Sequence, residues 1–180
     1  MSISSGVVWY PEEIKQSKWV HRFLDVAALV GSWSHDPSTK VGAVIADPIT
    51  HRLVSTGYNG FPSGVWDDKA RYDDRETKLH MIIHAEENAI LNARQSVEGM
   101  HIFIYPTIMI PACCHHCAAV IVQSGIKKVW MYNNDTPLPD RWKQSAGFAK
   151  TLLKEGGVEM GVVDRERSTV GGKVSTSYGL

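Results

Sequence analysis

A β-hairpin followed by alternating strands and helices is the pattern that most restricts how this sequence can fold. The segments VGAVIAD (residues 41–47) and RLVSTGYN (residues 52–59) are rich in β-branched residues, and a turn-sized PITH connection separates them. This spacing predicts an antiparallel hairpin. Three later segments have the length and apolar composition of buried strands: 101–105, 126–132 and 158–163.

Helical periodicity fills the intervals between these strands. Apolar residues recur at helical spacing from Pro11 to about Trp33, and a proline is typical of a helix start. Further helices are predicted in three places: from His84 to about Arg94, over residues 114–125, and over residues 141–157. Because strands alternate with helices after the hairpin, we predict an α/β fold in which a mixed sheet carries helices on both faces.

A highly charged segment, residues 65–80, interrupts the alternation. Its composition predicts a solvated loop or an irregular insert, because most of its residues are charged in the run WDDKARYDDRETK. The alternative is that one of its cations, Arg71, Arg75 or Lys78, contacts a phosphate group.

Size and composition predict one domain. The 180 residues are 43% apolar and 21% charged, which is enough to bury a core without disulfides. Neither an internal repeat nor a low-complexity run divides the chain. We therefore expect a single domain over residues 1–162 and a loose polar tail over residues 163–180.

The charge balance and the apolar runs limit the expected partners. Lysines plus arginines equal aspartates plus glutamates at 19 each, so the long-range attraction required for non-specific nucleic-acid binding is absent. The apolar runs are too short to cross a bilayer, and the N-terminus lacks a basic segment followed by an apolar one. We expect no nucleic-acid partner, no membrane partner and no export.

All three cysteines lie within residues 113–117, in the sequence CCHHC. Neighbouring cysteines cannot link distant parts of a fold, and their odd number also argues against a disulfide framework. This distribution favours a reducing cytoplasm and a metal site.

Two predicted helix starts carry the residues suited to that metal. His84 and Glu86 lie at one start, and Cys114 and Cys117 lie at another. Side chains in a first helical turn lean back toward the helix start, so two such turns can aim at one point. One imidazole and two thiolates are ligands that Zn²⁺ prefers, and three protein ligands leave the fourth position for water. Glu86 is then the expected proton shuttle, and HxE followed by CxxC is the signature of zinc-dependent deaminases.

Each half of this pattern has a plainer interpretation. An isolated HxE is common, and an isolated CxxC can be a redox pair or half of a structural zinc site. The combination is far more specific. The ligand register stays open, because Cys113 and Cys117 also share a helix face and His115 and His116 are additional candidate ligands. We favour Cys114 with Cys117.

The motifs HAEENAI, CCHHCAAVIVQSGIKKV, STKVGAVIAD and GYNGFPSG resemble those of the deoxycytidylate (dCMP) deaminases in the cytidine deaminase superfamily. The resemblance extends from about residue 17 to about residue 160. It implies a three-layer αβα fold with a five-stranded sheet, one catalytic Zn²⁺ and hydrolysis of dCMP to dUMP and ammonia, which supplies dUMP for dTMP synthesis. It also implies a homo-oligomer, usually a hexamer, activation by dCTP, inhibition by dTTP, and Mg²⁺ accompanying the effector triphosphate.

The resemblance assigns roles to individual residues. His84, Cys114 and Cys117 match the zinc ligands, Glu86 matches the proton shuttle, and Asn59 and Ala85 match substrate-binding positions. Residues of the STK and GYNGFPSG motifs are candidates for effector or phosphate binding: Ser38, Thr39, Lys40, Gly57, Tyr58, Gly60, Pro62 and Gly64. The alternative for the glycines is a tight turn after a strand.

Two features depart from the family pattern. The proline that directly precedes the first ligand cysteine is replaced by Cys113, with Pro111 two positions earlier. Some relatives carry a second, structural zinc ion bound by additional cysteines, and we expect this chain to lack it because all of its cysteines lie in one cluster.

Three functions follow from these observations. The leading one is a dCMP deaminase. The second is a zinc deaminase acting on nucleic acid, tRNA or a free nucleoside, for which Trp66, Tyr72 and Trp130 are possible stacking residues. The third is a zinc-stabilised module that binds nucleotides without turnover, and Glu86 argues against it because a structural site has no use for that carboxylate.

Overall fold

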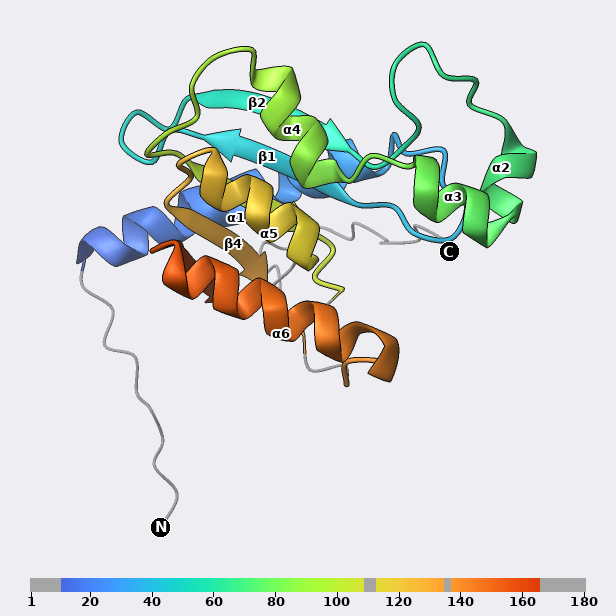
Figure 1. The fold of residues 1–180 in the computed structure, drawn as a ribbon. Coiled ribbons are helices and arrows are strands. Elements are labelled where there is room, and N and C mark those ends of the chain that lie inside the picture. Colours follow the sequence, from blue (N-terminus) through green and yellow to red (C-terminus); the bar gives the residue numbers. More distant parts are fainter. Residues whose placement is uncertain (1–10, 109–112, 135–136, 166–180) are drawn as a thin grey trace, which may run out of the picture.

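The structure, a computed structural model, describes residues 11–108, 113–134 and 137–165, with side chains described from Lys18 onward. Its elements follow the predicted alternation (Figure 1). In chain order they are α1 (Pro11–Gly31), β1 (Gly42–Ala46), β2 (Leu53–Tyr58), α2 (Lys69–Asp73), α3 (Arg75–Met81), α4 (Ala85–Ala93), β3 (His101–Tyr105), α5 (His115–Gln123), β4 (Lys128–Tyr132), α6 (Asp140–Glu155) and β5 (Glu159–Val163).

The five strands form one mixed sheet in the order β2-β1-β3-β4-β5. Strand β1 pairs antiparallel with β2 and with β3, whereas β3, β4 and β5 are parallel. Gly42, the first residue of β1, lies opposite both Tyr58 and Tyr105, the last residues of β2 and β3. One edge of the sheet therefore collects the carboxyl ends of β2 and β3 and the chain that enters β1.

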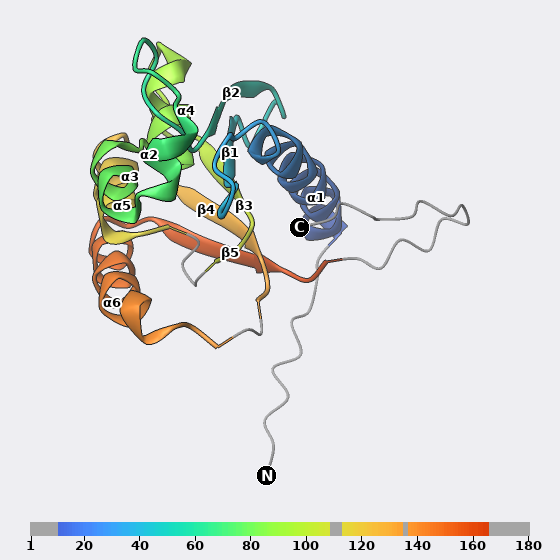
Figure 2. The same cartoon turned by 90° about the vertical axis from the view of Figure 1, so that its right-hand side faces the viewer.

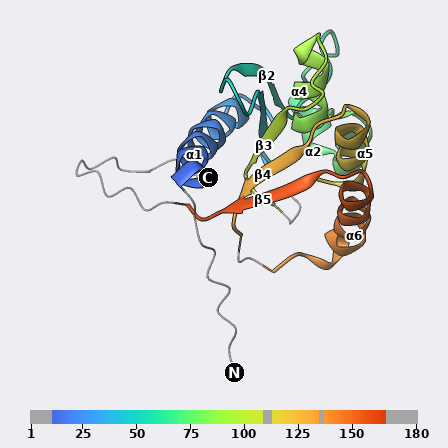
Figure 3. The same cartoon turned by 90° about the vertical axis from the view of Figure 1, so that its left-hand side faces the viewer.

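Helices cover both faces of the sheet, as predicted. Figures 2 and 3 show α1 on one face and α4, α5 and α6 on the other. Successive side chains of a strand point to opposite faces, and all five residues of β1 are buried. Val44 packs in the core beneath α1, and Ile45 packs in the core beneath α4 and α5.

Glycines allow two helices to approach the sheet closely. A Cβ atom on Gly42 would lie 2.0 Å from the carbonyl oxygen of Ala27 in α1. A Cβ atom on Gly57 would lie 2.3 Å from the backbone nitrogen of Ala89 in α4. Both distances are shorter than any real carbon contact, so only glycine is compatible with this packing. At Gly57, close packing of α4 on β2 accounts for the glycine.

The prediction for residues 65–80 was wrong in part. Residues 69–73 and 75–81 form the short helices α2 and α3, whose N-cap residues are Asp68 and Asp74. Each of these aspartates accepts a hydrogen bond from a backbone N–H of the first turn, the usual arrangement of an N-cap. The helices are too short for apolar periodicity to reveal them.

The ends of the predicted domain are described in part. The first helix ends at Gly31, two residues before Trp33, and β5 extends to Val163. Most of the predicted tail, residues 166–180, lies outside the described residues. Within the described part of the chain, every helix is too short or too polar to span a lipid bilayer.

Candidate metal and catalytic site

The candidate site lies at the edge where β2 and β3 end. The chain leaving β2 forms a two-residue bridge with the chain entering α4, in which Gly60 and Ile83 exchange backbone hydrogen bonds of 3.2 and 2.9 Å. His84 follows Ile83 directly and is the N-cap residue of α4. Cys114 is the N-cap residue of α5, the helix that follows β3. Two helix N-termini therefore meet at this edge.

The structure brings His84, Cys114 and Cys117 together. The Nδ1 atom of His84 lies 3.4 Å from Sγ of Cys114 and 3.3 Å from Sγ of Cys117, and the two sulfurs are 3.6 Å apart. A tetrahedral zinc ion, with Zn–S of about 2.3 Å and Zn–N of about 2.0–2.1 Å, requires sulfurs about 3.8 Å apart and nitrogen about 3.6 Å from sulfur. The three donor atoms fit such an ion to within a few tenths of an ångström.

The other candidate ligands lie apart from this group. Cys113 is 1% exposed and packs in the core under α5, outside the cluster of His84, Cys114 and Cys117. The Nδ1 atom of His115 lies 2.9 Å from Oγ of Ser145 in α6, and His116 is exposed. The geometry thus favours Cys114 over Cys113. Pro111, where the chain departs from the expected proline position, lies outside the described residues.

Hydrogen bonds among these three residues change their proton affinities in the metal-free protein. The hydrogen bond to Cys117 lowers the pKa of Cys114 to about 3. The same bond raises the pKa of Cys117, so the two sulfurs share a single proton. The hydrogen bond to the Cys114 thiolate raises the pKa of His84 to about 9. The pair of sulfurs therefore already holds the negative charge that attracts a cation.

Glu86 lies in the first turn of α4, two residues after His84, and is 4% exposed. Burial raises the pKa of its carboxyl group to about 7. This carboxyl lies outside the cluster of the three candidate ligands. A buried carboxyl with a pKa near neutrality can both accept and donate a proton under physiological conditions.

A pocket opens above this cluster and is lined by both polar and apolar side chains. Glu86, His84 and Cys114 are among the residues that line it. Apolar residues from four parts of the chain contribute to its lining: Val41, Leu79, Ile82, Ala85, Ile108 and Trp142. The remaining lining residues are polar: Asp36, Thr39, Asn59 and Lys78. A mixed lining of this kind suits a small ligand with an aromatic ring and a polar tail.

Asn59 organises the loop that precedes β1. Its Oδ1 atom accepts a 2.7 Å hydrogen bond from the backbone N–H of Val41. Its Nδ2 atom donates to the carbonyl of Thr39 at 2.8 Å and to Oδ2 of Asp36 at 3.3 Å. The predicted substrate-binding residues Asn59 and Ala85 thus both line the pocket, and Asn59 also holds part of its wall in place.

Asp36 is a member of the site that the sequence analysis missed. The residue is 0% exposed, and its Oδ1 atom accepts hydrogen bonds from the N–H and hydroxyl of Ser38 and from the N–H of Thr39. Burial alone would raise its pKa, but the bonds from Lys78, Ser38 and Thr39 outweigh burial and lower it. The DPST sequence, typical of an aspartate that caps its own turn, was the available signal.

The effector candidates fall into two groups. Thr39 lines the pocket. Ser38 does not line it but bonds to Asp36 and Lys78, and Lys40 donates to the carbonyl of Ser34 at 2.6 Å. Asn59 of the glycine-rich motif lines the pocket, but none of the effector candidates in that motif does: Gly57, Tyr58, Gly60, Pro62 and Gly64.

Comparisons with known proteins place this geometry in context. Residues 17–133 match the family model described as the cytidine and deoxycytidylate deaminase zinc-binding region. A protein of Aliivibrio fischeri, described as an uncharacterized deaminase in the luxG 3′ region, is 44% identical over 146 residues, covering 80% of this chain and 92% of that protein. A probable deoxycytidylate deaminase of Caenorhabditis elegans is 42% identical over 123 residues, covering 67% of this chain but only 60% of the nematode protein.

A solved structure has the same fold. The dCMP deaminase of the cyanophage S-TIM5, in its complex with dCMP and dUMP, superposes with a TM-score of 0.59, covering 87% of this chain and 100% of the phage chain. The two sequences are 24% identical. The two proteins therefore share the mixed five-stranded sheet and its flanking helices.

Proposed function

The chain belongs to the cytidine and deoxycytidylate deaminase family, and we propose that it is a zinc-dependent enzyme that hydrolyses dCMP to dUMP and ammonia. One observation carries this proposal: the convergence of His84, Cys114 and Cys117, with donor spacings that fit a tetrahedral ion, beside the buried carboxyl of Glu86. The substrate is supported by relatives named as deoxycytidylate deaminases at 36–42% identity.

His84, Cys114 and Cys117 would hold the zinc ion. When bound, the ion supplies a Lewis acid that makes water nucleophilic near neutral pH. Three protein ligands leave the position for that water open, which distinguishes a catalytic site from a closed structural one. The positive ends of α4 and α5 both point at the site and stabilise negative charge there.

Glu86 carries the protons in the proposed reaction. Its carboxylate removes a proton from the attacking water, whose oxygen forms a bond to C4 of the cytosine ring. The carboxyl returns this proton to N3 of the ring. The carboxylate then takes the second proton from the new C4 hydroxyl and passes it to the amino group, so that C4=O forms as the C4–N bond breaks and ammonia leaves. Burial, which raises the pKa of Glu86 to about 7, suits both directions of transfer.

The pocket walls position the pyrimidine nucleotide. We propose that the cytosine ring lies between the apolar side chains of Ile82, Ile108 and Trp142, which exclude bulk water from the reacting carbon. Asn59 would contact the sugar through the second lone pair of Oδ1, and Ala85 would face the base from the first turn of α4. Polar residues of the pocket lining then remain for the phosphate.

Turnover by the purified, zinc-loaded chain tests the proposal. The substrates are dCMP, cytidine, deoxycytidine and a cytosine-containing oligonucleotide, and the loss of cytosine absorbance measures conversion to uracil. We expect dCMP to have the highest kcat/KM. Conversion of the oligonucleotide alone would overturn the proposal in favour of a deaminase that acts on nucleic acid, and conversion of none, with zinc bound, would indicate a non-catalytic module.

We also propose that dCTP activates the enzyme and dTTP inhibits it, with Mg²⁺ accompanying the triphosphate, in a cytoplasmic homohexamer. This proposal rests on the STKVGAVI and GYNGFPSG motifs and on cysteines that are all free and buried. Sigmoidal dCMP kinetics that become hyperbolic with dCTP are the expected result, and sedimentation should give a mass of six chains. Kinetics insensitive to both triphosphates would remove the regulatory role, and a monomer would remove the assembly.

A further inference from the structure

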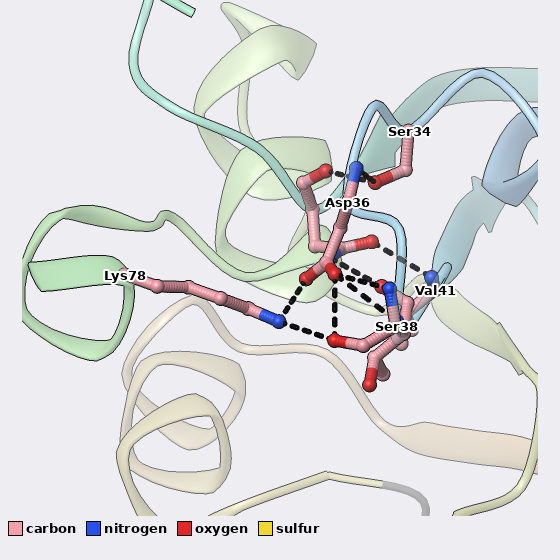
Figure 4. A network of polar contacts seen from close by, with 7 residues as sticks. Ser34, Asp36, Ser38, Val41 and Lys78 are labelled. Carbon is pink, nitrogen blue, oxygen red and sulfur yellow. Dashed lines mark hydrogen bonds and ion pairs between the residues drawn. The ribbon is translucent and has the colours of Figure 1, made fainter. Parts of the chain in front are cut away.

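Lys78 lines the pocket. Two residues of the loop before β1 fix the position of its side chain (Figure 4). It lies in α3, and its Nζ atom is 2.6 Å from Oδ2 of Asp36 and 2.7 Å from Oγ of Ser38. The side chain of Lys78 is 13% exposed and that of Asp36 is 1% exposed. A lysine held this way has lost most of the rotamer freedom of its four-carbon side chain, so its charge occupies a defined place.

The ammonium group of Lys78 lies in the same pocket as the candidate catalytic residues. Among the described residues that line the pocket, Lys78 is the one lysine or arginine, and it shares the lining with His84, Glu86 and Cys114. An ammonium group has three donors. Asp36 and Ser38 accept two hydrogen bonds from Lys78, which leaves one donor for a ligand in the pocket.

The carboxylate of Asp36 does not depend on Lys78 alone. It accepts three hydrogen bonds at Oδ1, from Ser38 and Thr39, and one at Oδ2 from Asn59. The loop around Asp36 is therefore held together even without the lysine, and the lysine is free to serve a second purpose. Asp36 stabilises the ammonium charge in a largely desolvated place, where electrostatic interactions are screened less than in water.

The other two cations of this segment are placed elsewhere. Arg71 donates to the carbonyl of Trp66 at 3.0 Å and lies over the ring of Phe61. Arg75, in the first turn of α3, is exposed. Neither lines the pocket. Of the three cations that the sequence offered for phosphate binding, the geometry selects Lys78.

We propose that Lys78 binds the 5′-phosphate of the nucleotide in this pocket and thereby makes the enzyme prefer a nucleotide to a nucleoside, while Asp36 and Ser38 position the ammonium group. The inference rests on the proposed function of the site and adds to it the residue that reads the phosphate. A compact ammonium is a common phosphate ligand in proteins.

The test compares kcat/KM for dCMP with kcat/KM for deoxycytidine in wild type and in Lys78→Gln, both zinc-loaded. Glutamine can still donate to Asp36 but carries no charge. We expect the ratio of the two values to fall about 10- to 100-fold, which corresponds to about 1.4–2.8 kcal/mol and is the usual size of one hydrogen bond to a charged group. Lys78→Arg should restore part of the preference. The matched control is Lys69→Gln, which removes an exposed lysine paired with Asp73 at 2.7 Å in the adjacent helix, and its ratio should equal that of wild type.

If deoxycytidine turnover is too slow to measure, competitive inhibition by dUMP and by deoxyuridine gives the same ratio as inhibition constants. Equal losses for the nucleotide and the nucleoside would overturn the inference and leave Lys78 a structural role. An altered response to dCTP with an unchanged ratio would also overturn it, in favour of an effector contact. A wild-type protein that turns over none of the substrates would overturn the proposed function itself, and the inference would fall with it.

Discussion

The Nδ1 atom of His84 lies 3.3 Å from the Sγ atom of Cys117, although 33 residues separate the two in the chain. This contact exists because α4 and α5 begin at the same edge of the sheet, where β2 and β3 end. The helix starts supply both the side chains and the positive ends of two helix dipoles. The chemistry of the site is thus a direct consequence of the strand order.

The first prediction concerns which sulfurs bind metal. Cys114→Ala and Cys117→Ala should each reduce zinc to well below one ion per chain, because each removes one of three converging donors. Cys113→Ala should retain one zinc ion per chain, since Cys113 packs in the core outside the cluster. Metal analysis after gel filtration measures all three. Loss of zinc in Cys113→Ala with retention in Cys114→Ala would reverse the register.

The second prediction separates metal binding from proton transfer. Glu86→Gln should keep its zinc and its fold but lose dCMP turnover by at least about 10²-fold, the usual contribution of general acid–base catalysis. Glutamine has nearly the same shape as glutamate but no proton to transfer. The neighbouring Glu87→Gln is the matched control, since Glu87 lies outside the lining of the pocket. Full activity in Glu86→Gln would show that another group carries the proton.

Much of the architecture could be predicted because local patterns determine it. The hairpin of β1 and β2 and the helix starts at His84 and Cys114 follow from β-branched segments, a short turn and the spacing of apolar residues. The strand His101–Tyr105 was predicted to the residue because a short, largely apolar run between two helices has few alternatives. The clustering of His84, Cys114 and Cys117 was predicted from residue types that share one chemistry.

The parts that were missed depend on contacts that are distant in sequence. The hydrogen bond from Lys78 to Ser38 joins residues 40 positions apart, and no periodic pattern in the sequence predicts it. The role of Gly57 as a packing position for α4 is visible only when the helix lies on the strand. Helices α2 and α3 were not predicted, because two short helices with aspartate N-caps lack an apolar face that can be recognised in the sequence.

The third prediction tests Asn59 as the support of the pocket wall. Asn59→Ala should lower the free energy of unfolding by about 2–4 kcal/mol, because the buried side chain of Asn59 makes three hydrogen bonds, to Asp36, Thr39 and Val41. Asn92→Ala is the control. Asn92 also donates two hydrogen bonds, but it is exposed, so its loss should cost less than about 1 kcal/mol. Urea denaturation measures both, and equal costs would contradict the role of Asn59.

The fourth prediction concerns the close approach of α4 to β2. Gly57→Ala would place a Cβ atom 2.3 Å from the nitrogen of Ala89 and 2.5 Å from the oxygen of Ala85. Helix α4 must then move, which should cost about 1–3 kcal/mol or more and reduce turnover, because α4 carries Glu86. Gly147→Ala, in α6, meets nothing within 4 Å and should stabilise the protein by about 0.5–1 kcal/mol with normal turnover. Thermal unfolding and dCMP kinetics distinguish the two, and a neutral Gly57→Ala would contradict this packing.

The fifth prediction is a pH dependence of stability that arises at His101, on the face of the sheet opposite the active site. Burial, aided by the nearby charge of Lys128, lowers the pKa of His101 from 6.5 to about 4. Its Nδ1 atom accepts a 3.1 Å hydrogen bond from Nε1 of Trp130, which requires the unprotonated ring. Because the unfolded chain binds this proton more readily than the folded one, the stabilisation is complete above pH 6.5 and is lost as the pH falls toward 4.

The variant His101→Asn isolates this contribution, since the amide oxygen of asparagine can accept from Trp130 but does not titrate. Between pH 6.5 and 4, wild type should lose up to about 1.4 kcal/mol of unfolding free energy per pH unit relative to the variant. Above pH 7 the difference between the two proteins should be constant, which separates the titration from any general cost of the substitution. Parallel stability curves for the two proteins from pH 7 to 4 would mean that His101 titrates normally in the folded protein.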